Sequence, residues 1–229
     1  MTLHRFFVAP DEAAGDRFAL PATIARQVRA VLRLRDGERI VLLAGDGVEL
    51  LCRLDGETCV VEERRPAAGE PAHRLTVVQA LLKGDALEEV VQHATELGVA
   101  GFRLVVTERC VAREISPRKL ERLRAIVREA AEQSERGIVP PVEPPVPLGE
   151  VLQRGSVMLL ERLGSSRLVE VAAPATIIIG PEGGFSPAEV RAAAAAGVEA
   201  AWLGPRILRA ETVATAAAAV ILSRTGDFA

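Results

Sequence analysis

The sequence has no tyrosine, and aromatic residues make up only 3% of the chain. This scarcity argues against a nucleic-acid-binding protein that works mainly by stacking bases on aromatic side chains. Cysteine is also scarce: Cys52, Cys59 and Cys110 are odd in number and have no CxxC spacing. We therefore expect neither a disulfide framework nor a zinc site, and no other bound metal.

Long apolar runs are absent as well. A run such as 175–179 (ATIII) is far shorter than the roughly 20 residues that a membrane-spanning helix needs. The first residues, MTLHRFF, are soon followed by Pro10 and Asp11 and lack the apolar region of a signal peptide. We expect a soluble protein of a reducing compartment, the cytoplasm, that does not associate with membranes.

Lysine is nearly missing, because Lys83 and Lys119 are the only two among 28 basic residues. Arginine suits phosphates and base edges, but a genome biased towards arginine codons produces the same skew, and we favour that explanation. The net charge of −3 argues mildly against a protein that simply coats nucleic acid. With 229 residues, 49% of them hydrophobic, the chain is long enough for one large or two small packed domains.

The first 65 residues or so carry short apolar runs separated by turn signals. Gly45-Asp46-Gly47 and Asp55-Gly56 separate three such runs, a pattern typical of antiparallel hairpins in a small barrel or sandwich. Residues 21–32 predict a single helix with Ile24, Val28, Val31 and Leu32 on one face. The Pro/Gly/Ala stretch 66–72 is the best domain boundary, so we predict a β domain over 1–68 and a second domain over 73–229.

The second domain alternates strands with longer helices, which predicts an α/β fold with a mainly parallel sheet covered on both faces. Capping-box patterns at Asp85/Glu88 and Ser186/Glu189 mark two helix starts. Predicted strands cover 75–82, 102–106, 157–161, 175–179 and 200–203; helices begin at Asp85, Ser116-Pro117, Ser186-Pro187 and about 211; residues 140–147 form a proline-rich connector.

Two loops follow apolar strands and lead into helices, which is where open α/β sheets bind ligands. The first is GPEGGFS at 180–186, whose glycines allow close approach of another group. The second is LGPRILRAET at 203–212, which places Arg206 and Arg209 in an otherwise apolar turn. A plain strand-to-helix turn explains either loop alone, but the two together favour a pocket.

Taken together, these two loops resemble the paired signature of the RsmE family in the SPOUT superfamily. Further segments match in family order: HRFF at 4–7, VLRL at 31–34, ATELGV at 94–99 and EAAEQSER at 129–136. The resemblance implies an enzyme that methylates N3 of a uridine in the 16S ribosomal RNA of the small subunit, using S-adenosylmethionine. It also implies a PUA-like β-barrel domain that binds RNA, a SPOUT-type α/β domain with a trefoil knot, and a homodimer.

The resemblance further implies site residues. Cofactor contacts would come from one wall at Leu159, Leu203, Gly204, Ile207 and Leu208, from an opposite wall at Gly180, Pro181, Glu182, Gly183 and Gly184, and from Thr212. Glu182 suits either a sulfonium cation or the adjacent helix start. Arg209 is our candidate for stabilising the anion of the reacting base, and Glu211 is either a general base or a helix-start carboxylate. Phosphate contacts are expected from Arg5, Arg26, Arg33, Arg35, Arg113 and Arg136.

Two other functions stay open on the sequence. One is a methyltransferase of the same superfamily that acts on a ribose 2′-oxygen or on another base. The other is a non-catalytic RNA-binding or assembly factor, against which the two intact loops argue. The apolar face of the last helix, including Val213, Ala217, Val220 and Ile221, suits a subunit interface or ordinary core packing.

Overall fold

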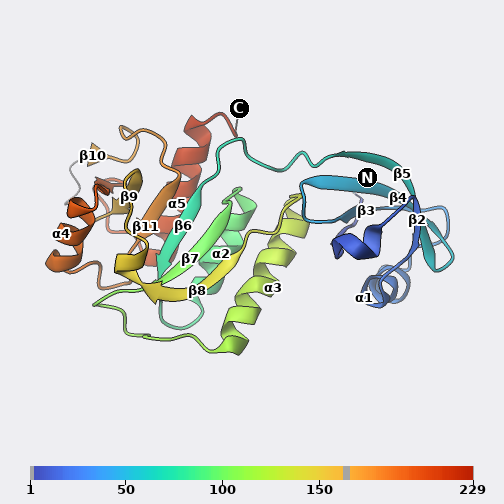
Figure 1. The fold of residues 1–229 in the computed structure, drawn as a ribbon, viewed down its shortest axis with the longest axis horizontal. Helices are drawn as coiled ribbons and strands as arrows, with labels where there is room; N and C mark the ends of the chain where they lie inside the picture. Colours follow the sequence, from blue (N-terminus) through green and yellow to red (C-terminus); the bar gives the residue numbers. More distant parts are fainter. Residues whose placement is uncertain (1–2, 162–165, 229) are drawn as a thin grey trace. The chain divides into compact units, whose positions relative to one another are not determined.

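A computed structural model describes residues 3–161 and 166–228 (Figure 1). The chain divides into two compact units, each described here by itself. Unit 1 comprises Met1–Glu70 with Ala131–Val139, and unit 2 comprises Pro71–Ala130 with Pro140–Ala229. Residues 131–139 therefore belong to the first unit, although they lie far along the sequence from the predicted span of 1–68.

Unit 1 is built on a five-stranded sheet in the order β1-β3-β4-β5-β2. Its strands are β1 (Arg5–Phe7), β2 (Arg17–Ala19), β3 (Arg39–Leu43), β4 (Val48–Asp55) and β5 (Thr58–Pro66). The two predicted hairpins are confirmed, because β4 pairs antiparallel with both β3 and β5. The sheet is mixed, because β1, which is not among the predicted runs, pairs parallel with β3.

The predicted single helix over 21–32 is two shorter segments. The α-helix α1 (Ala22–Arg26) passes into a π-helical turn over Gln27–Val31, where the Leu32 N–H donates to the Gln27 carbonyl five residues earlier. Because a π-helical turn contains more residues than an α-helical turn, the residues that follow it point in directions different from those a regular α-helix would give them. Ile24 and Val28 are buried as predicted, whereas Val31 is 69% exposed.

Unit 2 contains a seven-stranded sheet in the order β10-β12-β9-β11-β6-β7-β8, and every strand pair in it is parallel. The strands are β6 (Thr76–Ala80), β7 (Gly101–Val106), β8 (Val142–Pro147), β9 (Ser156–Leu159), β10 (Ser166–Arg167), β11 (Thr176–Ile179) and β12 (Glu199–Trp202). All four residues of β11 are buried, as expected of a strand covered on both faces. The predicted parallel α/β fold is confirmed.

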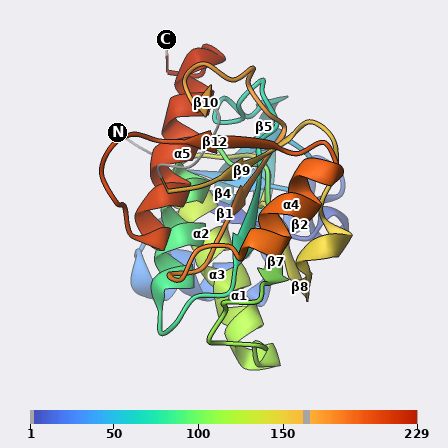
Figure 2. The ribbon, with the colours of Figure 1, turned by 90° about the vertical axis from the view of Figure 1, so that its left-hand side faces the viewer.

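Helices cover the two faces of this sheet. They are α2 (Ala86–Glu96), α3 (Pro117–Gln133), α4 (Pro187–Ala195) and α5 (Ala210–Arg224). Helices α2 and α5 pack together on one face, and α4 lies on the other (Figure 2). Val90, Val91 and Ala94 form the buried stripe of α2.

Two local expectations for unit 2 are wrong. The Asp85 side chain does not cap α2; its carboxylate instead pairs with Lys119 Nζ at 3.1 Å, and this hydrogen bond lowers the pKa of Asp85. The proline-rich connector forms β8, which pairs with β7 along one side only. An edge strand tolerates proline because one row of its N–H groups has no partner strand.

Candidate functional site

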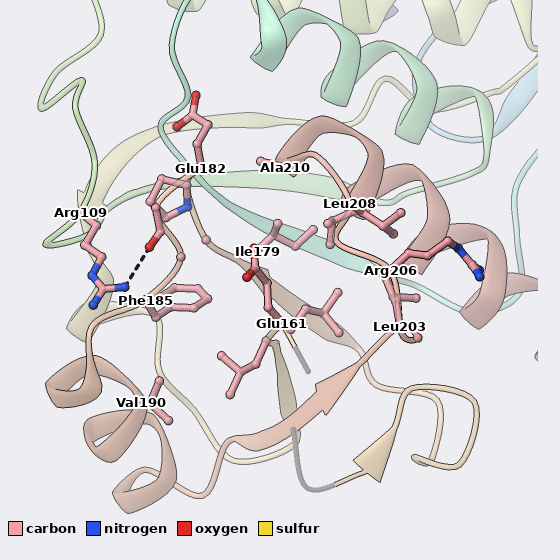
Figure 3. A pocket seen from close by; sticks show the side chains of 18 of the residues that line it. Arg109, Glu161, Ile179, Glu182, Phe185, Val190, Leu203, Arg206, Leu208 and Ala210 are labelled. Carbon is pink, nitrogen blue, oxygen red and sulfur yellow. Dashed lines mark hydrogen bonds between the residues drawn. The ribbon is translucent and has the colours of Figure 1, made fainter. Parts of the chain in front are cut away.

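A cavity of about 560 Å³ opens at the carboxyl ends of β9, β11 and β12 (Figure 3). The three strands are neighbours, and Leu159 at the end of β9 is in register with Ile179 of β11 and Ala201 of β12. The loops that follow these strands therefore begin at the same edge of the sheet. This is the edge at which open parallel sheets bind ligands.

The loop after β11, residues 180–185, forms one wall of the cavity. A Cβ atom added at Gly180 would lie 3.1 Å from Cε2 of the buried Phe185 ring. A larger residue at position 180 would therefore push the ring or the loop out of place. Glycine here lets the backbone of this wall approach a bound molecule closely.

Contacts from two other strand ends hold this loop. The Lys83 N–H, after β6, donates to Glu182 Oε1 at 3.0 Å. The Arg109 guanidinium, after β7, donates to the Gly183 carbonyl at 2.9 Å, the dashed line in Figure 3. One oxygen of Glu182 thus supports the loop itself, while the residue also lines the cavity.

The start of α4 reinforces the same loop. The predicted capping box is confirmed: Ser186 Oγ accepts from the Glu189 N–H, and Glu189 Oε2 accepts from the Ser186 N–H at 2.8 Å. Glu189 Oε1 also accepts the Glu108 N–H at 2.7 Å. One carboxylate therefore joins the helix start to the segment after β7.

The loop after β12 forms the facing wall, with Leu203, Gly204 and Leu208 against the cavity. Arg209 is the N-cap residue of α5, its side chain is 87% exposed, and its Nη1 lies 3.8 Å from Glu211 Oε1. The Glu211 side chain is 19% exposed. Both residues are adjacent in the sequence to residues that line the cavity, namely Leu208 and Ala210.

Comparison with known proteins identifies the family. Residues 69–222 match the family model described as an RNA methyltransferase domain. Ribosomal RNA small subunit methyltransferase E of Synechocystis sp. is 34% identical over 95% of this chain and 77% of its own length. The protein of the same name from Mycobacterium bovis is 37% identical over 86% of this chain and 80% of its own.

The chain belongs to the ribosomal RNA small subunit methyltransferase E family. The resemblance drawn from the two loop motifs is therefore confirmed. A solved structure of the Neisseria gonorrhoeae member, bound to S-adenosyl methionine, matches with a TM-score of 0.88 and 30% identity. It covers 97% of this chain and 98% of that one.

Most of the family-derived cofactor positions line the cavity. The lining includes Leu159, Gly180, Pro181, Glu182, Gly183, Gly184, Leu203, Gly204 and Leu208. Ile207 and Thr212 lie outside it, and Ile207 is 67% exposed. The motifs gave no sign of Arg109, Glu161 or Val190, which also line the cavity, because these residues come from other segments of the chain.

The arginines expected to contact phosphate fall into two groups. Arg26, Arg33, Arg35 and Arg113 are exposed. The Arg5 side chain is only 12% exposed and pairs with Glu135 at 3.0 Å. Arg136 is 2% exposed, and its Nη2 lies 2.9 Å from Glu70 Oε2. A guanidinium buried in this way is not accessible to a phosphate, so the prediction that Arg136 contacts RNA is corrected.

Among residues 3–161 and 166–228, no group of three or more metal-ligating side chains is found, and no helix combines the length and apolar character needed to cross a membrane. The three cysteines are free and buried.

Proposed function

We propose that this protein methylates N3 of a uridine in the 16S ribosomal RNA of the small subunit, with S-adenosylmethionine as methyl donor. The supporting observation is that both signature loops of the family meet across one cavity at the carboxyl ends of neighbouring strands. The relatives named for small-subunit ribosomal RNA, and the cofactor in the Neisseria protein, point the same way.

The residues present fit such a cofactor. A volume of about 560 Å³ lies within the range of small-molecule sites, and backbone from the two loops walls it on facing sides. Ile179, Leu203 and Leu208 supply apolar surface for a flat base. Backbone N–H and C=O groups beside them suit the hydrogen-bonding edges of adenine.

When bound, the cofactor supplies a methyl group on a positively charged sulfur. Uridine N3 must lose its proton for the new N–C bond, and the negative charge then spreads onto O2 and O4. We assign Arg209 to stabilise that charge, since its side chain is exposed and its chain neighbours Leu208 and Ala210 line the cavity. Glu211 is a candidate to accept the proton, although it also suits the helix start. Holding the uridine base close to the methyl donor in the right orientation also accelerates methyl transfer.

The remaining family features are proposals for this chain. We infer that residues 1–68 form a PUA-like RNA-binding barrel, consistent with the five-stranded sheet of unit 1. Residues 73–229 would then be a SPOUT domain whose C-terminal segment threads a trefoil knot. Val213 and Val220 on α5 are only half-buried, which suits a homodimer interface. We infer a cytoplasmic protein from the proposed substrate in the small ribosomal subunit.

The direct test is a methylation assay. Small ribosomal subunits lacking the modification are incubated with the purified protein and S-adenosylmethionine, and their nucleosides are analysed by mass spectrometry. We expect N3-methyluridine. A 2′-O-methylated or other methylated nucleoside would assign a different reaction. Cofactor binding without any methylated nucleoside would favour the non-catalytic RNA-binding factor.

The role of Arg209 is tested in the same assay. Arg209→Ala should leave the affinity for S-adenosylmethionine within about threefold while lowering turnover by roughly 100-fold or more, as expected when a group stabilising transition-state charge is removed. Arg74→Ala, at an exposed arginine before β6, serves as the control. Unchanged turnover in Arg209→Ala would remove this residue from the mechanism.

A further inference from the structure

Four charged side chains line the cavity: Arg109, Glu161, Glu182 and Arg206. Three of them are directed elsewhere. Arg109 donates to the Gly183 carbonyl, and Glu182 accepts the Lys83 N–H. Arg206 extends away from the cavity in Figure 3. Of the four, Glu161 is the side chain that neither supports the glycine-rich loop nor extends away from the cavity.

Glu161 lies two residues beyond the end of β9, next to the lining residues Leu159 and Leu160. Figure 3 places it in the middle of the lining, between the sides that carry Arg109 and Arg206. Within residues 3–161 and 166–228, no hydrogen bond or ion pair is found for its carboxylate. Glu161 is exposed to solvent and lies beside the apolar residues Leu159 and Leu160, so its negative charge is accessible and attracts a cationic group of a ligand bound there.

We propose that Glu161 recognises the positive charge of the sulfonium in the methyl donor. This inference rests on the proposed function. The amino-acid end of S-adenosylmethionine carries an ammonium and a carboxylate that cancel in net charge. The sulfonium is its one uncompensated cation, and a carboxylate attracts it without needing a hydrogen-bond donor.

A consequence concerns release of the product. Methyl transfer forms an N3–C bond and breaks the S–CH3 bond, whose electron pair stays on sulfur. The N3 proton passes to Glu211, the candidate base, or to solvent, and the sulfur becomes a neutral thioether. The attraction from Glu161 then disappears, so S-adenosylhomocysteine should be held more weakly than the donor. Glu161 thus acts as a residue that selects substrate over product.

The test compares two ligands that differ in this charge. Calorimetric titration gives the Kd of S-adenosylmethionine and of S-adenosylhomocysteine for the wild-type protein and for Glu161→Gln. We expect Glu161→Gln to weaken the sulfonium ligand by roughly three- to tenfold and the thioether by less than about twofold, the range for a partly solvated charge pair. Added salt should weaken only the sulfonium ligand.

Two variants serve as controls. Glu199→Gln removes an exposed carboxylate from the amino end of β12, the opposite end of the strand from the cavity, and should change neither Kd. Glu161→Asp keeps the charge and should retain the preference for the sulfonium ligand. Thermal unfolding of each variant checks that the fold is intact.

The outcomes separate this inference from the proposed function. An equal loss for both ligands in Glu161→Gln would overturn it, because Glu161 would then contact a group that the two ligands share. No loss for either ligand would overturn it as well. A wild-type protein that binds neither ligand would instead refute the proposed function, and this inference with it.

Discussion

Arg136 shows how the surroundings of a single residue decide what its charge does. Its guanidinium, 2% exposed, faces both oxygens of Glu70, with Nη2–Oε2 at 2.9 Å and Nε–Oε1 at 3.3 Å. Glu70 Oε1 also accepts the Ile138 N–H at 3.0 Å. The carboxylate therefore joins residue 70 to the 131–139 segment within unit 1. A charge this deeply buried requires a partner.

We expect Glu70→Ala to destabilise unit 1 by about 2 to 4 kcal/mol, because it leaves the Arg136 charge buried without its carboxylate. Hydrogen exchange of amides in β1 and β3 measures this locally, since the two units need not unfold together. Glu63→Ala is the control: its side chain is 50% exposed and lies 3.7 Å from Arg65, so its loss should cost less than about 1 kcal/mol. Equal, small losses in both variants would show that the ion pair contributes little.

Single residues also mark how far the sequence could specify the candidate site. Cavity-lining positions such as Gly180 and Leu203 could be predicted because they belong to loops that directly follow apolar strands. The sequence could not show which arginines are exposed and which are buried in ion pairs. Exposed Arg35 and buried Arg136 both lie in polar, charged segments, and only the fold brings Glu70 to the second of them.

At the scale of elements, apolar strands and capped helices were predictable because their signals are local. The run at 175–179 and the Ser186/Glu189 box each specify structure from a few adjacent residues. The failures involve partners distant in the sequence. Asp85 faces Lys119 of α3 instead of capping α2, and β8 forms because β7 offers it an edge.

The hydrogen bonds of the Glu189 carboxylate lead us to predict that the start of α4 is coupled to the loop 180–185, which forms one wall of the cavity. Glu189→Ala leaves the N–H groups of Ser186 and Glu108 without this acceptor. We expect a loss of about 1 to 3 kcal/mol in the free energy of unfolding and a several-fold higher Kd for S-adenosylmethionine. Ser186→Ala is the matched variant; it removes one capping bond and should cost about 1 kcal/mol with a smaller change in Kd.

Urea unfolding and calorimetry measure the two effects separately. A Glu189→Ala protein that loses stability but keeps its cofactor affinity would contradict the coupling. It would mean that the contacts of Arg109 and Lys83 hold the glycine-rich loop without help from α4.

The whole chain shows why its division could not be predicted in full. The stretch 66–72 signals a boundary through its composition, but nothing in 131–139 signals a return to the first unit. That segment belongs there through contacts: Ala131 packs with Phe7, Val41 and Leu43, and a Cβ added at Gly137 would lie 2.4 Å from the Ala67 Cβ. Such packing is a property of the folded unit and leaves no periodic pattern in the sequence.

Net charge is also a whole-molecule quantity, and it hides how arginines are distributed. The side chains of Arg17, Arg39 and Arg64 pair with Asp55, Glu62 and Asp16. Within the described residues of unit 1, no ion pair is found for Arg26, Arg33 or Arg35. We therefore expect the second set to contribute more than the first to displacing counterions from an RNA backbone.

Changing either set of three arginines to glutamine alters the net charge by the same amount. A difference in RNA binding between the two variants therefore reports where the arginines lie and not how many there are. The Arg26/Arg33/Arg35 variant should lower the slope of log binding constant against log salt by about 2 to 3, because three phosphate contacts are lost. The Arg17/Arg39/Arg64 variant should change that slope by less than about 1, since carboxylates already neutralise those side chains. Filter binding of a 16S ribosomal RNA fragment over a salt series measures both slopes. If the two variants shift the slope equally, overall charge governs RNA binding and the exposed arginines near α1 have no special part in it.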